Sequence, residues 1–344
     1  MAKLFFLFSG EHATLPIAEL RAILEAENHT FTVLETLDQA ARFEIELASV
    51  ESVKHRAAYT KICGLELFCC KAETNKIFTV MRSMNSAEVL KKNESFAVRA
   101  FHVKDYASAI DTVTLERDLG KIIQSQTAAK VNLKTPYKTF LGILTSGKFI
   151  FGLKLVEILP KPFVERRPKK KPFFHPSAMQ AKLARCMVNL ARPKADELVF
   201  DPFCGTGSML IEAALVGCRV LGLDVQRRMA KGALRNLRYF RVNPEGVIVG
   251  DSRNPPIATV DCVVTDPPYG RSASTMKRTT KQLVEDFLTA INDALSKKGK
   301  VCIAMPKTLN VKALGEALNY KHLESHFVYI HRSLTREIAV FEKE

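Results

Sequence analysis

The sequence predicts an α/β protein in which an α+β region precedes a doubly wound, Rossmann-like domain. Three observations carry this prediction: strand and helix patterns alternate regularly after residue 177, they alternate irregularly before residue 158, and a segment rich in proline and basic residues separates the two parts. A chain of 344 residues, 47% of them hydrophobic, is long enough for two domains with a core each. We therefore predict an α+β region over residues 1–157, a linker over 158–176 and the doubly wound domain over 177–344.

The first region combines strand-like apolar runs with amphipathic helical segments, as α+β domains do. The predicted strands are Leu4–Phe8, Phe43–Leu47, Leu65–Cys70, Phe96–Ala100, Phe140–Leu144 and Phe149–Leu155, and the predicted helical segments are Ile17–Leu24 and Leu115–Ile122. This pattern predicts a sheet with helices on at least one face.

The predicted linker begins with a proline-rich segment, Ile158–Pro172. It contains four prolines, and five residues of its second half are Lys or Arg. Because proline lacks the backbone N–H and fixes φ, we expect this segment to form neither a helix nor a central strand. Its basic run is either a solvated tether or a contact for phosphate groups.

Beyond the linker, strands and helices take turns, beginning with a helix that carries Met179–Leu190. The predicted strands are Leu198–Phe200, Val220–Leu223, Val247–Val249, Cys262–Thr265, Val301–Ala304, Val328–Ile330 and Ile338–Phe341, and further helices centre on Leu210, Leu234, Phe287 and Leu314. Such repetition predicts a mostly parallel sheet that is covered on both faces.

The charge is strongly positive and unevenly distributed. The formal net charge is +15; residues 1–165 carry 21 Lys and Arg against 19 Asp and Glu, and the remainder carries 30 against 17. A field of this sign favours a polyanionic partner, because each neutralised phosphate releases counterions. Charge alone leaves RNA, DNA and acidic proteins open.

The cysteine pattern disfavours a disulfide-rich or zinc-binding protein, and the short apolar runs disfavour a membrane or secreted protein. The eight cysteines form no Cys-x-x-Cys pair, so we expect buried free thiols in a reducing cytoplasm and no metal site. Apolar runs stay short of the roughly 18 residues of a membrane span, and the opening run is shorter than a signal-peptide core. We therefore expect a cytoplasmic protein without a membrane partner.

A glycine-containing turn follows the first strand of the doubly wound domain, within Val199–Ser208. Glycines let a ligand approach the backbone, and the helix that follows offers unpaired N–H groups. Asp224 ends the next strand, where a carboxylate can accept both hydroxyls of a ribose. A nicotinamide-type fingerprint would need a third glycine where Leu210 stands. The turn instead predicts an adenosine-bearing cofactor bound by residues Asp201, Cys204, Gly205, Thr206, Gly207 and Asp224.

Two further segments complete the predicted cofactor site. Asp251 and Ser252 close the third strand, where the Asp251 carboxylate either accepts from an adenine amine or makes an Asx-turn. His175 precedes the first helix of the domain, and Ser177 is the predicted N-cap. The N-terminus of that helix could also face the carboxylate of the cofactor.

The sharpest signal is Asp266-Pro267-Pro268-Tyr269 at the end of the fourth strand. An amine on an aromatic base is a poor nucleophile, because its lone pair is delocalised into the ring. If Asp266 and the Pro267 carbonyl each accept one N–H, the nitrogen can pyramidalise and aim its lone pair at a methyl group. Tyr269 would stack on the base. The motif predicts methyl transfer to an exocyclic base nitrogen, with Asp266 also beside the cofactor.

The residues resemble a known family, the archaeal tRNA guanosine N2-methyltransferases that act on position 10 of tRNA. Besides the two motifs, the segments that carry the resemblance are Leu7–His12, Phe173–Pro176, Met187–Ala191 and Ser333–Arg336. The resemblance implies a class I methyltransferase domain, preceded by an RNA-binding region with an N-terminal ferredoxin-like part and a THUMP domain around Phe96–Leu155.

The resemblance also implies roles for particular residues. Asp201, Gly205, Asp224 and Asp251 would bind S-adenosylmethionine, while Asp266, Pro267 and Tyr269 would hold the guanine. The products would be mono- and dimethylguanosine in tRNA. Some relatives need a small zinc-binding activator subunit and others act alone, and the sequence leaves both open.

Two alternative functions fit parts of the sequence. A methyltransferase for ribosomal RNA guanine or DNA adenine would use the same chemistry at Asp266. A non-catalytic RNA-binding protein could retain the fold as a scaffold, although the intact acidic motif residues disfavour this. Failure to bind S-adenosylmethionine would favour the scaffold.

Overall fold

The computed structural model describes residues 1–269, 279–332 and 334–344. The chain packs as two compact units: unit 1 comprises residues 1–13, 29–54 and 60–158, and unit 2 comprises residues 14–28, 55–59 and 159–344. Across the described ranges, no helix combines the length and the apolar character that crossing a membrane requires.

Unit 1 is built on an eight-stranded sheet with the strand order β2-β3-β1-β4-β8-β7-β5-β6. The strands are β1 (Ala2–Phe8), β2 (Phe31–Leu37), β3 (Ala40–Ile45), β4 (Thr60–Lys71), β5 (Ser95–His102), β6 (Lys130–Val131), β7 (Lys138–Thr145) and β8 (Lys148–Glu157). The helices are α2 (Ser49–Arg56), α3 (Thr74–Ser83), η1 (Ser86–Glu88) and α4 (Thr112–Thr127). The predicted α+β character is confirmed, and α4 packs its buried Leu115, Leu119 and Ile123 into a core with strands β5, β7 and β8.

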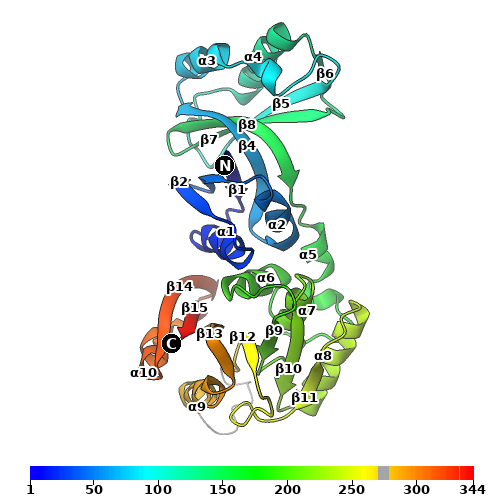
Figure 1. The fold of residues 1–344 in the computed structure, drawn as a ribbon, viewed down its shortest axis with the longest axis vertical. Helices are drawn as coiled ribbons and strands as arrows, with labels where there is room; N and C mark the ends of the chain where they lie inside the picture. Colours follow the sequence, from blue (N-terminus) through cyan, green and yellow to red (C-terminus); the bar gives the residue numbers. More distant parts are fainter. Residues whose placement is uncertain (270–278, 333) are drawn as a thin grey trace. The chain divides into compact units, whose positions relative to one another are not determined.

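Unit 2 contains a seven-stranded sheet with the order β11-β10-β9-β12-β13-β15-β14 (Figure 1). Its strands are β9 (Leu198–Asp201), β10 (Arg219–Asp224), β11 (Gly246–Val249), β12 (Val260–Thr265), β13 (Leu295–Pro306), β14 (Tyr320–His331) and β15 (Leu334–Lys343). Strands β11, β10, β9, β12 and β13 are parallel, and β15 is antiparallel to both of its neighbours, β13 and β14. This is the doubly wound sheet that the sequence predicts.

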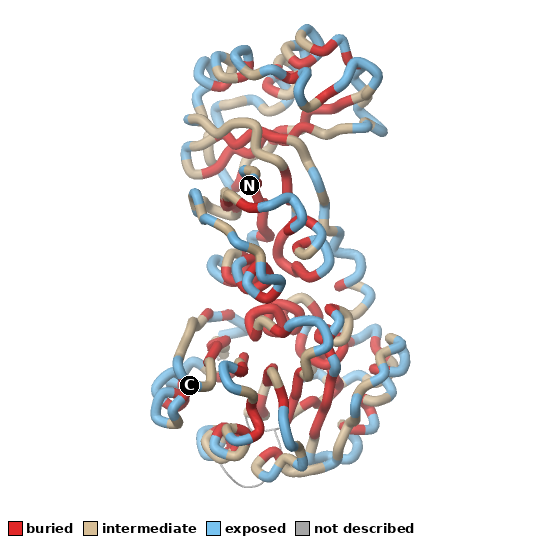
Figure 2. The backbone as a smooth tube through the Cα atoms, in the orientation of Figure 1, coloured by how far each residue is buried: buried red, intermediate tan, exposed pale blue. Residues whose placement is uncertain are grey.

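Helices cover both faces of this sheet. They are α1 (Leu15–Ala26), α5 (Lys161–Glu165), η2 (Pro168–Lys170), α6 (Ala181–Leu190), α7 (Ser208–Ala214), α8 (Arg227–Tyr239), α9 (Thr280–Asn292), η3 (Lys307–Leu309) and α10 (Val311–Ala317). One core joins the sheet to α6, α7 and α8, and a second joins it to α9 and α10. In Figure 2 the buried residues follow the central strands between these helices. The prediction of a sheet covered on both faces is confirmed.

The compact units differ from the predicted boundary at residue 157, because α1 lies in unit 2. The Glu19 carboxylate on α1 is fully buried and accepts from the backbone N–H of Tyr59 at 2.8 Å and from Asn189 Nδ2 of α6 at 2.9 Å. Arg56 is also buried, and its Nε donates to Asn189 Oδ1 at 3.3 Å. These hydrogen bonds hold α1 and residues 55–59 against α6. Local sequence patterns could not predict this contact, because it joins residues that are far apart in the sequence.

The proline-rich segment is more ordered than predicted. The expectation that it forms no helix was wrong, because α5 spans Lys161–Glu165 with a proline in its first turn, where the missing N–H has no intrahelical partner to lose. Arg166 pairs with Glu212 at 2.6 Å, and the Lys171 ammonium donates to Ser208 Oγ at 2.7 Å. Burial lowers the pKa of Lys171 to about 8. Part of the basic run is thus used inside unit 2 and is not free for phosphate.

Candidate active site

The site lies at the carboxyl edge of the parallel strands of unit 2. The turn after β9 has Gly205 at φ +52° and Gly207 at φ +78°, a left-handed conformation that side chains rarely adopt. It brings the Gly205 N–H to Asp224, the last residue of β10. Asp266 follows directly on β12. Because neighbouring parallel strands end at one edge, the two predicted motifs meet there.

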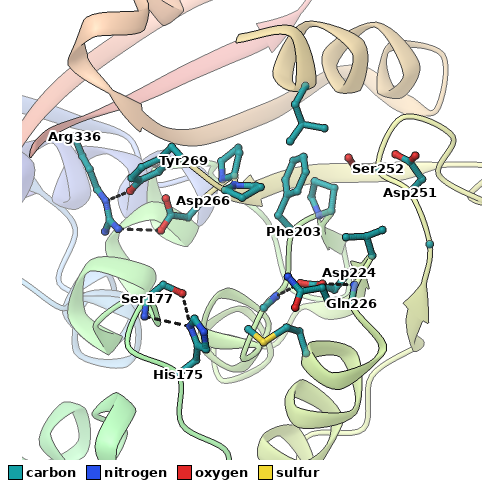
Figure 3. A pocket seen from close by; sticks show the side chains of 18 residues that line it. His175, Ser177, Phe203, Asp224, Gln226, Asp251, Ser252, Asp266, Tyr269 and Arg336 are labelled. Atoms are coloured by element: carbon teal, nitrogen blue, oxygen red, sulfur yellow. Dashed lines mark hydrogen bonds and ion pairs between the residues drawn. The ribbon is translucent and has the colours of Figure 1, made fainter. Parts of the chain in front are cut away.

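A cavity of about 270 Å³ opens between these strand ends (Figure 3). It is lined by His175, Ser177, Pro202, Phe203, Gly205, Asp224, Val225, Gln226, Met229, Gly250, Asp251, Ser252, Asp266, Pro267, Pro268, Tyr269, Leu283 and Arg336. Figure 3 shows Asp266, Tyr269 and Arg336 together at one side, with Asp251 and Ser252 at the opposite side. Among the described residues, no group of three or more His, Cys, Asp or Glu is arranged to hold a metal ion.

Asp224 is held by the backbone around it. Its Oδ2 accepts from the Gly205 N–H at 3.0 Å and its Oδ1 accepts from the Gln226 N–H at 2.8 Å. Burial raises the pKa of Asp224, and these two hydrogen bonds oppose the rise. The carboxylate is therefore fixed in position, and each oxygen keeps a lone pair for a further donor.

Asp251 lines the cavity, but its carboxylate already has a partner. Arg253 Nε lies 2.9 Å from both carboxylate oxygens, and the backbone N–H of Arg253 donates to Oδ1 at 3.0 Å. The last bond is the Asx-turn that the sequence also allowed. An adenine amine would have to share the carboxylate with Arg253, while the neighbouring Ser252 is buried against the same cavity.

Four of the predicted cofactor residues, Asp201, Cys204, Thr206 and Gly207, lie outside the cavity lining. Asp201 is 2% exposed, and its Oδ1 accepts from Thr265 Oγ1 at 2.7 Å and from the Phe203 N–H at 3.2 Å. Burial raises the pKa of Asp201 to about 7, with Asp224 and Asp266 adding to the rise. Asp201 thus ties β9 to β12 beneath the cavity, and the structure places it behind the wall rather than in it.

His175 and Ser177 reach the cavity from the segment before α6. Ser177 was predicted to cap this helix, which was wrong: α6 begins at Ala181 with Gln180 at its N-cap position. The Ser177 hydroxyl instead lies 2.7 Å from His175 Nδ1. This hydrogen bond fixes the imidazole at the cavity rim.

Asp266 forms an ion pair that the motif itself does not contain. Its Oδ2 lies 3.3 Å from Arg336 Nη2, whose Nε donates to the Tyr269 hydroxyl. Asp266 Oδ1 is buried and has no hydrogen-bond partner within the described ranges. Burial raises the pKa of Asp266 to about 6, against the opposing effects of Arg336 and the Tyr269 hydroxyl. Asp266 thus lines the cavity and holds one buried carboxylate oxygen without a hydrogen-bond partner among the described residues.

Several lining residues were missed by the sequence reasoning, among them Phe203, Met229, Leu283 and Arg336. Phe203 lies inside the glycine turn and could have been found there. Arg336 is the last residue of the segment Ser333–Arg336, which supported the family resemblance but was given no role in the site. Met229 and Leu283 sit on helices α8 and α9, and their patterns indicate only burial.

The lining fits an adenosine-bearing methyl donor. Asp224 offers carboxylate lone pairs where a ribose would lie, and the apolar side chains of Phe203, Met229 and Leu283 offer surfaces for an adenine ring. Asp266 and His175 place polar groups on the side of the cavity away from Asp251 (Figure 3).

Two family models match parts of the chain. A model of the RMKL-like methyltransferase domain matches residues 168–336. A model described as DNA methylase matches residues 74–235, a range that ends before Asp266.

Curated relatives match over the whole chain. The tRNA (guanine(10)-N2)-dimethyltransferase of Methanothermobacter thermautotrophicus is 36% identical, covering 99% of this chain and 99% of its own. The enzyme of the same name from Methanocaldococcus jannaschii is 32% identical, covering 98% and 99%. The mouse tRNA (guanine(10)-N(2))-methyltransferase TRMT11 is 24% identical, covering 80% and 68%.

Solved structures share the fold. TrmN from Thermus thermophilus aligns with a TM-score of 0.57 at 17% identity, covering 99% of this chain and 100% of its own. SMU.472 in complex with SAH aligns with a TM-score of 0.54 at 14% identity, covering 100% and 99%. The fold and the site define the chain as a class I methyltransferase that uses S-adenosylmethionine. It belongs to the tRNA (guanine(10)-N2)-dimethyltransferase family.

Proposed function

We propose that the protein methylates the exocyclic N2 of guanosine 10 in tRNA, once and then a second time. The observation that carries this proposal is the buried, unpartnered Oδ1 of Asp266, a residue that lines the cavity. A buried acceptor without a partner costs about 1–3 kcal/mol, which an N–H of the base would relieve. The family membership supplies the substrate.

The bound cofactor supplies an electrophilic methyl group on a sulfonium. We propose that Asp266 Oδ1 and the Pro267 carbonyl accept the two N–H groups of the amine, so that its lone pair turns toward that methyl carbon. With the cofactor bound, the nitrogen would take the methyl group while sulfur keeps the bonding pair, and the Asp266 carboxylate would accept the proton that the nitrogen loses. The Tyr269 ring stacks on the base.

We propose cofactor roles for the lining residues His175, Gly205, Asp224, Asp251 and Ser252. Asp201, Cys204, Thr206 and Gly207 support the turn from behind. Two independent contacts of Asp224 with the backbone, at 3.0 and 2.8 Å, favour its role as the ribose acceptor.

If Asp224 holds the ribose, replacing Asp224 by Ala should weaken S-adenosylmethionine binding about 100-fold, since two hydrogen bonds to a charged group are lost. Isothermal titration with S-adenosylmethionine measures this. Glu316→Ala on α10, which removes an exposed carboxylate outside the cavity lining, is the matched control and should bind within about threefold of the unmodified chain. Equal affinities for Asp224→Ala and the control would remove Asp224 from the site.

The tRNA itself is proposed to bind unit 1, with its THUMP-type domain around β5 to β8, and the basic surface of unit 2. Arg228, Lys231, Arg235 and Arg238 on α8 are exposed, while Ala233 and Leu237 on the other side of the helix are buried. The excess of 30 Lys and Arg over 17 acidic residues from Arg166 onward supports a polyanionic substrate. A cytoplasmic location accords with such a substrate.

The test uses tRNA transcripts and methyl-labelled S-adenosylmethionine, followed by digestion to nucleosides. We expect label in N2-methylguanosine and then in N2,N2-dimethylguanosine, and none in a transcript with adenosine at position 10. Activity of the purified chain alone would show that a small zinc-binding activator subunit is not required. Ribosomal RNA and duplex DNA form the other arms, and label there without label in tRNA would keep the chemistry and reject the substrate.

A further inference from the structure

Arg336 reaches the catalytic motif from a distant part of the chain. Strand β15 is antiparallel to β13, and Arg336 stands opposite Pro306, the last residue of β13. β13 in turn runs parallel to β12, which ends one residue before Asp266. The antiparallel strand β15 therefore places Arg336 at the same edge of the sheet as Asp266, which follows the parallel strand β12.

The guanidinium has a different partner for each of its nitrogens. Nη2 lies 3.3 Å from Asp266 Oδ2, Nε donates to the Tyr269 hydroxyl, and Nη1 lies 3.4 Å from Met179 Sδ. The Arg336 carbon Cζ also lies 5.5 Å from the centroid of the Tyr269 ring. The side chain is 13% exposed. Arg336 is thus fixed, and it contacts both residues to which we assign the target base.

These contacts divide the Asp266 carboxylate into two unlike oxygens. Oδ2 pairs with Arg336, whereas Oδ1 is buried and has no hydrogen bond of normal geometry in the described part of the chain; the Tyr269 hydroxyl is near enough to the carboxylate to favour its ionised form. A carboxylate without Arg336 could turn about its last bond and exchange the two oxygens. The ion pair therefore keeps the two oxygens from exchanging, with Oδ2 held on Arg336.

We propose that Arg336 is a positioning residue for methyl transfer, which orients the ionised Asp266 carboxylate with Oδ1 toward the base and holds the Tyr269 ring for stacking. This inference rests on the function proposed above. It adds to the motif a residue that acts through Asp266 and Tyr269 and does not itself touch the reacting atoms.

The charge on Asp266 also depends on its other neighbours. The charge of Asp266 raises the pKa of Asp201 on β9, and Arg336 and Tyr269 favour the ionised Asp266 carboxylate. The side chains of His175, Asp224 and Asp251 line the same cavity. With a pKa of about 6, Asp266 is ionised above that pH and protonated below it. Since a protonated Oδ1 accepts an N–H poorly, kcat should fall as the pH drops below about 6. Removing Arg336 should raise the pKa of Asp266 further and move this fall to higher pH.

The experiment compares Arg336→Gln, Arg336→Lys and a matched control, Arg219→Gln. Arg219 is an exposed, ion-paired arginine at the start of β10, where it lies 2.8 Å from Glu245. We would measure kcat on the tRNA transcript from pH 5 to 9, and the affinity for S-adenosylmethionine. Arg336→Gln should lose about 30- to 100-fold in kcat at pH 7, while cofactor affinity stays within a few-fold. The decrease of kcat toward acidic pH, here called the acid limb, should begin at a higher pH in this variant.

Arg336→Lys should retain more activity and an acid limb near that of the unmodified chain, because it keeps the positive charge. Arg219→Gln should match the unmodified chain. The proposal would be overturned if kcat of Arg336→Gln falls at the same acidic pH as kcat of the unmodified chain. This holds whether kcat at pH 7 is intact or reduced to the level of Arg336→Lys, because a purely structural role would not change the pH dependence.

A second readout separates this proposal from the proposed function. The carboxyl carbon of Asp266 can be followed by nuclear magnetic resonance in protein labelled with ¹³C-aspartate, without any RNA, and assigned by its loss in Asp266→Asn. We expect Asp266 to titrate at higher pH in Arg336→Gln than in the unmodified chain. Equal titration would reject the role of Arg336 even if tRNA is methylated, and a shift would support it even if tRNA is not the substrate.

Discussion

Replacing Asp266 by Ala should lower kcat about 1,000-fold while cofactor affinity stays within about tenfold. The substitution removes the unpartnered Oδ1 and leaves Arg336 without the carboxylate that it contacts at 3.3 Å. Loss of a well-placed acceptor or proton-transfer group typically costs two to four orders of magnitude in rate. Single-turnover methylation of the tRNA transcript measures the chemical step directly.

Two further variants sharpen this test. Asp266→Asn keeps the shape of the side chain but removes its charge, and it should remain at least about 100-fold impaired. The matched control is Asp196→Asn in the exposed turn before β9, where φ is +65° and asparagine is as well tolerated as aspartate. If Asp266→Ala retains its rate within tenfold while the control behaves normally, another group must accept the amine N–H.

The largest effect on stability is expected from Glu19→Ala, which should destabilise unit 2 by about 3 kcal/mol. Glu19 is fully buried and accepts from the backbone N–H groups of Ala58 and Tyr59 and from Asn189 Nδ2. Alanine leaves the two backbone N–H groups without this acceptor, and Asn189 Nδ2 keeps only its hydrogen bond to the Arg56 carbonyl at 3.0 Å. The penalty is moderated because the carboxylate is itself costly to bury.

The effect of Glu19 should depend on pH. Burial raises the pKa of Glu19 from 4.5 to about 7, against the opposing hydrogen bonds. Between these values the folded protein holds a proton that the unfolded chain has lost, so the contribution of Glu19 to stability is full below pH 4.5 and declines as the pH rises through 7. Glu19→Ala should therefore be more destabilising at pH 5 than at pH 8.

Urea denaturation at both pH values measures this, using the transition that S-adenosylmethionine shifts to higher urea, because the cofactor stabilises only the unit that binds it. Glu316→Ala on α10 is the control: its side chain is 50% exposed and pairs with Lys312 at 3.8 Å, so the change should stay within about 0.5 kcal/mol. A Glu19→Ala midpoint equal to that of the control would contradict the assigned role of this cluster.

The local patterns of the sequence predicted the course of the chain well. The strands and helices of unit 2 follow the predicted order, because apolar periodicity and the turn residues act over a few residues. Asp224 ends β10 and Asp266 follows β12, the two strands on either side of β9, so their meeting at one edge of the parallel sheet follows from the βαβ repetition. The family resemblance also rested on such local segments, and the whole-chain relatives confirm it.

Long-range contacts were beyond this reasoning. Asn189 lies in a segment that was quoted for its resemblance, but its partner Glu19 is 170 residues away in sequence, so the pattern could not show that α1 packs in unit 2. Asp201 was predicted in the cofactor site from its place in the glycine turn. In the structure it is buried at the end of β9, where its carboxylate accepts a hydrogen bond from the Thr265 hydroxyl.

The sequence by itself determined the fold class and the family, and it predicted the chemistry of the acidic motif and the residues that carry it. Only the tertiary structure decided which oxygen of Asp266 pairs with Arg336, because Arg336 lies on an antiparallel strand whose neighbour in space is set by sheet order and not by sequence distance. Propensity and spacing act along the chain, whereas the ion pair at the target site depends on how distant strands are brought to one edge.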